Sequence, residues 1–326
     1  MERLTDQFGR SLHYLRISLT DRCNFRCVYC MPPEGISLLP RAEVLRIDEF
    51  ERLARIFVSL GINKIRLTGG EPLLRHKIVA LVAALSHIDG LNELGLTTNG
   101  SLLAPLAQPL KEAGLASVNV SLDSLDPERF SRITLRDEFP VVLEGIGQAL
   151  KAGLKVKINV VVLDSLTKEE VIAFCRMTRE KPVEVRFLEF MPLCGTGWKL
   201  EQTKPIALIR EWIREEFDLH PLPRNGQVAE TYTLNSGLGR IGFIASMTEP
   251  FCDSCTRLRL TSTGGFHPCL FSLMETDLRT PMRKGSPDEE IARLIRETAW
   301  LKPKGHGEFL EKNKYEELPK IRSLGG

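Results

Sequence analysis

The feature that most constrains the fold is a strand-like segment that recurs between helical stretches. Six such segments are rich in Val, Ile and Leu and are bounded by turn residues: 12–20, 64–70, 91–100, 117–124, 156–164 and 183–192. Residues 47–61 show the clearest helical periodicity, and Asp48 can cap their start while Gly61 can end them in a left-handed turn. Strand and helix alternate in units of mostly about 25 to 30 residues, which is typical of parallel β/α architecture.

The ends of these strands carry the polar and glycine-rich sequences TGGEP, TTNG, SLDS and EFMP. In β/α barrels the carboxyl ends of the strands build the active site. Only six strands are evident up to Pro192, whereas a closed barrel of this type has eight. We therefore expect an α/β fold, an incomplete (β/α)6-type TIM barrel that is open on one side.

The sequence changes in character after about residue 220. Residues 221–226 are predicted to be a linker, 229–247 short antiparallel strands with glycine turns, and 286–302 a helix. This part is too small and too rich in loops to form a large independent domain. We expect residues 1–220 to form the partial barrel and residues 221–326 to form an extension that packs on it.

The overall charge gives no reason to expect a polyanionic partner. Among 326 residues, 44 Lys and Arg nearly balance 42 Asp and Glu, so the net charge is +2 and neither nucleic acid nor a membrane is predicted as a partner. The N-terminus lacks the apolar core of a secretion signal, and no apolar run of about 18 residues occurs. A cytoplasmic location is the expectation, and any anion site must be local.

The chain has eight cysteines, which in a reducing compartment indicate metal binding or redox chemistry better than disulfides. Cys175 and Cys194 stand alone and are expected to be small buried apolar residues. The other six form two groups. The first cysteine group is Cys23, Cys27 and Cys30, and the second cysteine group is Cys252, Cys255 and Cys269.

The first cysteine group has Cys-x3-Cys-x2-Cys spacing within TDRCNFRCVYCMPPEG. Three thiolates can bind three irons of a [4Fe–4S] cubane and leave the fourth iron without a protein ligand. An open metal position is where a substrate or cofactor binds, as in catalytic zinc sites. A zinc site completed by a distant residue, or three uninvolved thiols, are the alternatives.

The second cysteine group has Cys-x2-Cys-x13-Cys spacing in a hairpin-like region. Cys-x2-Cys is a common zinc spacing, and His267 or His306 could supply a fourth ligand. Arg257 and Arg259 alternate with leucines, which puts both guanidinium groups on one strand face. Such a pair can clamp a phosphate or triphosphate, although a solvated strand face is the alternative.

Longer motifs around both groups resemble a known family. Tyr29 just before the last cysteine of the first group, with TGGEP at residues 68–72, resembles the radical S-adenosylmethionine (SAM) superfamily. Cys-x2-Cys-x-Arg-x-Arg, the segment TDRCNFRCVYCMP and the terminal Gly-Gly resemble the GTP 3′,8-cyclase (MoaA) family of molybdenum cofactor biosynthesis. The resemblance covers essentially the whole chain. The tail reads SLGG, where the family more often has isoleucine before the glycines.

The resemblance implies a lyase-type radical SAM enzyme that uses two [4Fe–4S] clusters and SAM. It implies that a 5′-deoxyadenosyl radical takes hydrogen from C3′ of GTP, after which C3′ attacks C8 of guanine. The implied product is (8S)-3′,8-cyclo-7,8-dihydroguanosine 5′-triphosphate. In this family the first cysteine group holds the SAM cluster, and the second holds a cluster whose open iron contacts guanine.

The resemblance also assigns individual residues. SAM contacts are expected at Tyr29, Gly70, Ser121 and Met191, and GTP contacts at Arg16, Arg66, Thr97, Lys157, Arg186, Arg257 and Arg259. Catalytic roles are expected for Arg16, Arg257, Arg259 and the tail residues Gly325 and Gly326, which the family inserts near the active site. Without the family, Lys157 could pack its stem at the barrel mouth, and Ser121 and Thr97 could cap turns.

The expected partners are GTP, a reducing electron donor, a downstream cyclic pyranopterin monophosphate synthase that takes the product, and a second copy of the chain in a homodimer. Two other functions compete. One is a radical SAM peptide maturase with an auxiliary cluster, although such enzymes usually have more auxiliary cysteines. The other is a non-catalytic metal-binding scaffold with zinc at the second cysteine group.

Overall fold

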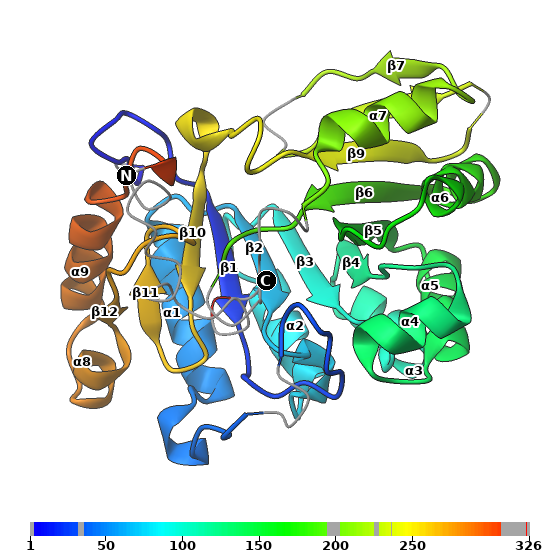
Figure 1. Cartoon of the computed structure of the whole chain (residues 1–326). Coiled ribbons are helices and arrows are strands. Elements are labelled where there is room, and N and C mark those ends of the chain that lie inside the picture. Colours follow the sequence, from blue (N-terminus) through cyan, green and yellow to red (C-terminus); the bar gives the residue numbers. More distant parts are fainter. Residues whose placement is uncertain are drawn as a thin grey trace.

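A computed structural model describes residues 3–31, 36–193, 203–224, 228–235, 237–307 and 324. The described strands form one twelve-stranded sheet in the order β12-β11-β10-β1-β2-β3-β4-β5-β6-β9-β8-β7. Strands β1 to β6 run parallel, and the helices that connect them lie on the outer side of the curved sheet (Figure 1). This arrangement confirms the predicted partial α/β barrel.

The strands are β1 (Tyr14–Ser18), β2 (Lys64–Thr68), β3 (Glu93–Thr98), β4 (Ser117–Ser121), β5 (Lys155–Val162), β6 (Val183–Glu189), β7 (Leu219–Pro221), β8 (Glu230–Leu234), β9 (Arg240–Ile244), β10 (Arg257–Leu260), β11 (Gly265–His267) and β12 (Thr276–Asp277). The helices are α1 (Ile47–Ser59), α2 (Ile78–Ser86), α3 (Leu103–Glu112), α4 (Pro127–Thr134), α5 (Phe139–Lys151), α6 (Lys168–Glu180), α7 (Ile206–Arg214), α8 (Arg279–Arg283) and α9 (Asp288–Trp300). Short 3-10 turns are η1 (Arg41–Glu43), η2 (Pro72–Leu74) and η4 (Cys252–Ser254).

Helix α1 begins two residues earlier than a cap at Asp48 would place it. Its N-cap is Arg46, whose backbone N–H donates to Glu49 Oε2 at 2.7 Å, so the prediction that Asp48 caps the helix was wrong. Glu49 caps the helix in place of Asp48, because its carboxylate accepts a hydrogen bond from the Arg46 backbone N–H, which has no partner within the helix. Gly61 does follow the helix in the left-handed region, with φ of +100°, as predicted.

The alternation of side chains along the strands separates a packed layer from a cavity. In β5, the fully buried Val156, Ile158, Val160 and Val162 belong to the hydrophobic core of the protein. The residues between them are only partly buried and line the inner side of the sheet. The period of two residues thus assigns one strand face to stability and the other to the site.

The C-terminal region continues the barrel sheet at both of its edges. Strand β10 pairs in parallel with β1, and β9 pairs in parallel with β6, while β8 and β9 form the predicted antiparallel pair. No pairing joins β12 to β7 among the described strands, so the barrel is open. The strands of the C-terminal region are therefore part of the same sheet as those of the barrel. The predicted boundary after residue 220 falls within β7.

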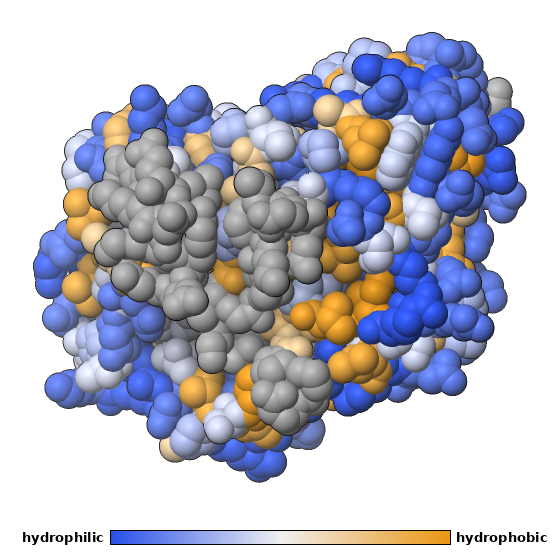
Figure 2. All heavy atoms as spheres, viewed as in Figure 1, coloured by the Kyte–Doolittle hydropathy of each residue, from blue (hydrophilic) through white to orange (hydrophobic). Residues whose placement is uncertain are grey.

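Where the face in Figure 2 is not drawn in grey, hydrophilic residues predominate and apolar residues lie among them. Exposed large apolar residues, such as Leu238 and Trp300, are few among the described residues and come from different elements. Within the described chain, no helix combines the length and apolar character needed to cross a membrane.

Candidate functional site

One cavity of about 1310 Å³ lies on the inner side of the sheet. Both cysteine groups line it, together with every other predicted site residue that the structure describes: Arg16, Tyr29, Arg66, Gly70, Thr97, Ser121, Lys157, Arg186, Met191, Arg257 and Arg259. Gly325 and Gly326, the remaining two predicted residues, lie outside the described residues. The fold therefore gathers residues from segments that are more than two hundred positions apart in the sequence.

Strand register brings the basic residues together. Arg16 on β1 lies beside Arg66 on β2 and beside Arg259 on β10. On the opposite side, Lys157 on β5 lies beside Glu184 on β6. Side chains that are neighbours in register point to the same face of a sheet, so these charged groups face the same cavity.

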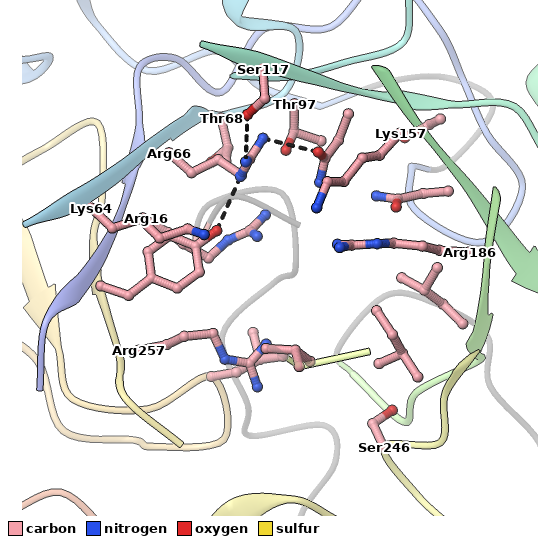
Figure 3. Close-up of a pocket in the computed structure, with 18 of the residues that line it drawn as sticks. Arg16, Lys64, Arg66, Thr68, Thr97, Ser117, Lys157, Arg186, Ser246 and Arg257 are labelled. Carbon is pink, nitrogen blue, oxygen red and sulfur yellow. Dashed lines mark hydrogen bonds between the residues drawn. The ribbon is translucent and has the colours of Figure 1, made fainter. Parts of the chain in front are cut away.

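The guanidinium of Arg66 is held by the protein itself. It donates to Tyr14 Oη at 3.0 Å, to the Leu96 carbonyl and Asn119 Oδ1 at 3.0 Å, and to Ser117 Oγ at 3.1 Å, as the dashed lines in Figure 3 show in part. Arg66 is accordingly buried. These bonds fix its position before any ligand binds.

A glycine makes room for this buried arginine. A Cβ atom on Gly95 would lie 2.6 Å from Arg66 Nη2 and 2.8 Å from Ser117 Oγ. Gly95 is the register neighbour of both residues. Any side chain at this position of β3 would displace the guanidinium, a requirement that the sequence did not reveal.

Cations outnumber carboxylates around the cavity. Its described lining includes eleven Lys or Arg residues and three Glu residues. In Figure 3, Arg16 and Arg66 extend into the cavity from one side, and Lys157 and Arg186 extend from the other. Converging like charges repel one another, so binding a polyanion here is electrostatically favourable.

Burial and the nearby positive charges lower the pKa values of two basic residues in the cavity wall. Burial and the adjacent Arg186 lower the pKa of Lys157 to about 8, although Glu184 opposes the shift through an ion pair of 3.4 Å. Burial, followed by repulsion from Arg16 and Arg257, lowers the pKa of Arg259 well below its usual value. A bound anion would relieve both effects.

The end of β2 packs tightly on the loop of the first cysteine group. The Gly70 N–H donates to the Thr20 carbonyl at 2.7 Å, and a Cβ on Gly70 would lie 2.3 Å from the Arg22 carbonyl oxygen. Gly69 has φ of +149°, a conformation that favours glycine. The space that a side chain at Gly70 would need is filled by the backbone of the cysteine loop.

A buried carboxylate supports this loop from the neighbouring strand ends. Glu71 accepts hydrogen bonds from the Leu73 and Asn99 backbone and from Thr98 Oγ1, at 2.7 to 2.9 Å. Burial raises its pKa to about 7. Asn99 in turn donates to Asn24 Oδ1 at 2.8 Å. The sequence marked Glu71 only as part of a motif, and the long-range contacts that explain it become visible in the structure.

Tyr29 is anchored in the same way. Its hydroxyl donates to Asp123 Oδ2 at 2.7 Å, and Asp123 Oδ1 accepts from the Val161 backbone N–H at 2.8 Å. Burial raises the pKa of Asp123. Asp123 lies in the SLDS motif and was not predicted as a site residue. Its role is to orient the aromatic ring beside the cysteines.

The first cysteine group fits a cluster by its chemistry. All three are reduced cysteines in the wall of the cavity. Burial raises the pKa of Cys23, and burial with the Asp123 charge and the two neighbouring cysteines raises that of Cys27 well above its usual value. Mutual influence of this kind requires thiols that lie near one another. Metal binding would release their protons.

The second cysteine group faces the same cavity. Burial raises the pKa of Cys255, but the Arg257 guanidinium and the Lys302 ammonium outweigh it and lower the pKa to about 6. Cys252 Sγ lies 3.2 Å from Nδ1 of His306. Among the described residues, no three His, Cys, Asp or Glu side chains are arranged to surround one metal ion. Three thiols with adjacent cations suit a negatively charged cluster.

Two buried polar atoms in the cavity wall have no hydrogen-bond partner among the described residues. They are Thr97 Oγ1 and Asn159 Oδ1. Buried polar atoms are rarely left unpaired, so both fit a polar ligand in this cavity. Thr97 was predicted from the sequence, whereas Asn159 was not, although its place two residues after Lys157 puts it on the same strand face.

The end of the described chain also reaches this region. Leu324 is fully buried, and its carbonyl accepts a hydrogen bond from Arg259 Nη1 at 2.7 Å.

Of the two single cysteines, Cys175 is buried, as predicted, and burial raises its pKa to about 12. Cys194 lies outside the described residues.

Two family profiles together match most of the chain. The Radical SAM superfamily matches residues 17–178, and Molybdenum Cofactor Synthesis C matches residues 183–308. Each cysteine group lies within one of these two ranges. The C-terminal match begins with β6, before the boundary expected from composition.

Relatives of known name align over nearly the full length. The chain is 45% identical over 310 residues to a GTP 3′,8-cyclase of Pelotomaculum thermopropionicum, covering 93% of this chain and 95% of the relative. It is 42% identical over 332 residues to the mitochondrial GTP 3′,8-cyclase of Arabidopsis thaliana, covering 100% of this chain and 84% of the relative. It is 41% identical over 321 residues to human molybdenum cofactor biosynthesis protein 1, covering 98% of this chain and 50% of the relative.

Among solved structures, Streptococcus suis SuiB bound to its precursor peptide SuiA has the same fold. The TM-score is 0.63 at 15% sequence identity, over 95% of this chain and 75% of SuiB. At this identity the likeness concerns the fold alone.

Proposed function

This chain belongs to the GTP 3′,8-cyclase family of radical SAM enzymes, and from that membership we propose how it acts. The cavity converts GTP into (8S)-3′,8-cyclo-7,8-dihydroguanosine 5′-triphosphate. The reaction is the first step of molybdenum cofactor biosynthesis, and its cofactors are [4Fe–4S] clusters and SAM. One observation carries the proposal. Both cysteine groups line the same cavity as basic residues from six strands.

The first cysteine group would hold the SAM cluster, and Tyr29, Gly70, Ser121 and Met191 would hold SAM. When bound, this cluster supplies an electron and SAM supplies a carbon-centred radical that takes the hydrogen atom from C3′ of GTP. Asp123 fixes the Tyr29 hydroxyl, and the packing of Gly70 fixes the cysteine loop. These contacts keep the cofactor site rigid relative to the substrate.

GTP would lie across the basic part of the cavity. A triphosphate carries about four negative charges near neutral pH, which Arg16, Lys157, Arg186 and Arg257 can balance with charge-assisted hydrogen bonds. Thr97 offers a polar atom that lacks a partner within the described chain. Arg66 uses four of its five N–H donors on protein acceptors, and it would contribute charge and position the neighbouring groups.

The second cysteine group would hold the cluster that contacts guanine. Arg257 and Arg259 lie on β10 beside it, and Arg259 also binds the Leu324 carbonyl. That bond supports a role for the tail that follows it. Deleting Gly325 and Gly326 is expected to spare both clusters and to abolish turnover, and normal product yield from the truncated enzyme would contradict this role.

We propose the partners of the enzyme from the same family membership. A low-potential electron donor must reduce the SAM cluster, and a cyclic pyranopterin monophosphate synthase would consume the product. We further propose a cytoplasmic location and a homodimer. Size-exclusion chromatography with light scattering tests the last point, since a single monomer mass would contradict it.

The central experiment uses GTP deuterated at C3′. The anaerobic, iron-reconstituted and reduced protein is incubated with SAM and this GTP, and the 5′-deoxyadenosine is analysed by mass spectrometry. We expect deuterium in that product. A matched control has serine in place of the three residues of the second cysteine group. It should keep the first cluster but form no deuterated 5′-deoxyadenosine.

Three outcomes separate the competing functions. Transfer of deuterium supports the cyclase. Cleavage of SAM without label removes C3′ as the target and favours a peptide maturase. Stoichiometric zinc with little iron favours a non-catalytic scaffold, because two cubanes require about eight irons per chain.

A further inference from the structure

A buried lysine joins two segments of the second cysteine group. Lys302 has 1% of its surface exposed, and its Nζ donates to the Arg257 carbonyl at 2.8 Å and to the Pro268 carbonyl at 2.6 Å. Arg257 follows Cys255 by two residues, and Pro268 directly precedes Cys269. One ammonium group therefore ties together the backbone on both sides of the hairpin.

A buried arginine from the opposite end of the chain holds the third segment. Arg10 Nη1 donates to the Cys252 carbonyl at 2.7 Å and to the Lys304 carbonyl at 2.8 Å, and Nη2 donates to the Pro303 carbonyl at 2.6 Å. Its Nε pairs with the fully buried Asp6 at 2.5 Å. Arg10 thus connects the loop of Cys252 to the segment that carries Lys302.

The same segment places an imidazole on a cysteine sulfur. His306 Nδ1 lies 3.2 Å from Cys252 Sγ, and the ring stacks on Phe271 with centroids 5.0 Å apart. His306 is buried. A thiolate can only accept a hydrogen bond, so Nδ1 must carry the proton when Cys252 binds metal.

We propose that Arg10, Lys302 and His306 are positioning residues of the second cluster. Arg10 and Lys302 hold the three cysteine segments at the separation that the cluster needs, and His306 donates an N–H bond to the Cys252 sulfur. The inference rests on the proposed function, in which the second cysteine group holds a [4Fe–4S] cluster.

The physical case comes from the cost of burying charge. A buried cation must have its donors satisfied. Lys302 bonds to backbone carbonyls next to the second cysteine group, whereas Arg10 bonds to the Cys252 carbonyl, to two carbonyls that follow Lys302 and to Asp6. Removing either leaves those carbonyls unpaired and frees the segments. A hydrogen bond to a cluster sulfur stabilises the reduced, more negative state, which raises the reduction potential.

The first test replaces Lys302 by methionine, which keeps most of its volume. We expect about eight irons per chain in the wild type and about four in Lys302→Met, with the spectrum of the first cluster retained. Lys204→Met is the matched control, since Lys204 also donates to a backbone carbonyl, that of Leu166 at 2.9 Å, but in another region. Full iron content in Lys302→Met would overturn the role of Lys302.

The first cluster also reports whether the variant folds. If Lys302→Met loses both clusters, Arg10→Lys and the His306 variants carry the test, because they keep the charge or the ring volume. Arg10→Lys cannot reach three carbonyls and should lose iron selectively from the second site. Equal loss from both sites in Arg10→Lys would contradict the proposal.

The second test concerns His306 and uses a reduction potential. His306→Phe keeps the stack on Phe271 and removes the donor, so the second cluster should assemble but have a lower potential. His306→Asn restores an N–H donor, so its reduction potential should return most of the way to that of the wild type. An unchanged potential in His306→Phe would overturn the hydrogen bond.

Pulsed electron paramagnetic resonance distinguishes a hydrogen bond from direct ligation. Weak nitrogen coupling that disappears in His306→Phe supports the proposal, whereas the strong coupling of an iron-bound imidazole would overturn it. Wild-type protein with only about four irons per chain would instead mean that the second cluster does not form and that the proposed function is wrong.

Discussion

Single residues in the cavity differ in how firmly the protein holds them. Arg66 is fixed by four acceptors, whereas Lys157 shares one carboxylate, that of Glu184, with Arg186. A residue that keeps donors available can contact a ligand directly. The strongest effects on GTP binding are therefore expected at Lys157 and Arg186.

Replacing Lys157 by methionine is expected to weaken GTP binding about 10- to 100-fold. A charge-assisted hydrogen bond contributes about 1.5 to 3 kcal/mol, and about 1.4 kcal/mol corresponds to a factor of ten. Anaerobic isothermal titration calorimetry measures the change. Lys151→Met, at the exposed end of α5, removes the same charge away from the cavity and should leave the affinity unchanged.

The affinity for GTP is expected to decrease as the pH rises through 8. The pKa of Lys157 is lowered to about 8, so the side chain is a cation below this pH and neutral above it, and the triphosphate prefers the cation. We expect a decrease of about fivefold from pH 8 to pH 9, because the protonated fraction of Lys157 falls by that factor. Lys157→Arg stays charged and should remove the decrease; an equally steep profile in that variant would rule Lys157 out as its source.

At the scale of elements, the end of β2 determines the shape of the cysteine loop. The backbone of Gly70 and Glu71 hydrogen-bonds to that of Thr20 and Arg22. Since Thr20 and Arg22 immediately precede Cys23, the strand transmits its rigidity to the first cysteine group. This connection joins the two motifs on which the family resemblance rests.

Gly70→Ala is expected to lose the first cluster. The new methyl group would lie 2.3 Å from the Arg22 carbonyl oxygen, so the loop must move. Iron should fall from about eight to about four per chain, and SAM cleavage should stop. Gly147→Ala, in the middle of α5, has nothing within 4 Å of the new methyl and should raise stability by about 0.5 to 1 kcal/mol. Full SAM cleavage by Gly70→Ala would contradict the steric argument.

The sequence predicted the elements better than their contacts. The six parallel strands, α1 and Gly61 followed from periodicity, because local pattern decides them. The N-cap of α1 did not, because Arg46 has no capping side chain of its own and its backbone N–H is bonded by Glu49 three residues later. Asp123 and Lys302 were missed because their partners lie 34 to 94 positions away, which no local pattern encodes.

At the scale of the whole molecule, the two predicted regions share one sheet. Strands β9 and β10, from the C-terminal region, cover the β6 and β1 edges of the barrel. An exposed strand edge pairs readily with other chains. The boundary after residue 220 is thus expected to divide functions, not folding units.

A fragment of residues 1–220 is expected to aggregate. It lacks β9 and β10, so β6 and β1 would present unpaired backbone groups. Size-exclusion chromatography and thermal unfolding check this, with the full-length chain carrying Ser at the second cysteine group as the control that keeps every strand. A monomeric fragment with a cooperative transition would show that the barrel folds alone.

The pairing of Tyr14 on β1 with Arg257 on β10 also sets an order of events during synthesis. When the ribosome has made the first six strands, the first cysteine group is already complete, but one side of β1 has no neighbour. The part of the cavity lined by Arg257 and Arg259 forms only after residue 260 has left the exit tunnel. We therefore expect the first cysteine group to be able to take up a cluster before the proposed substrate site is complete.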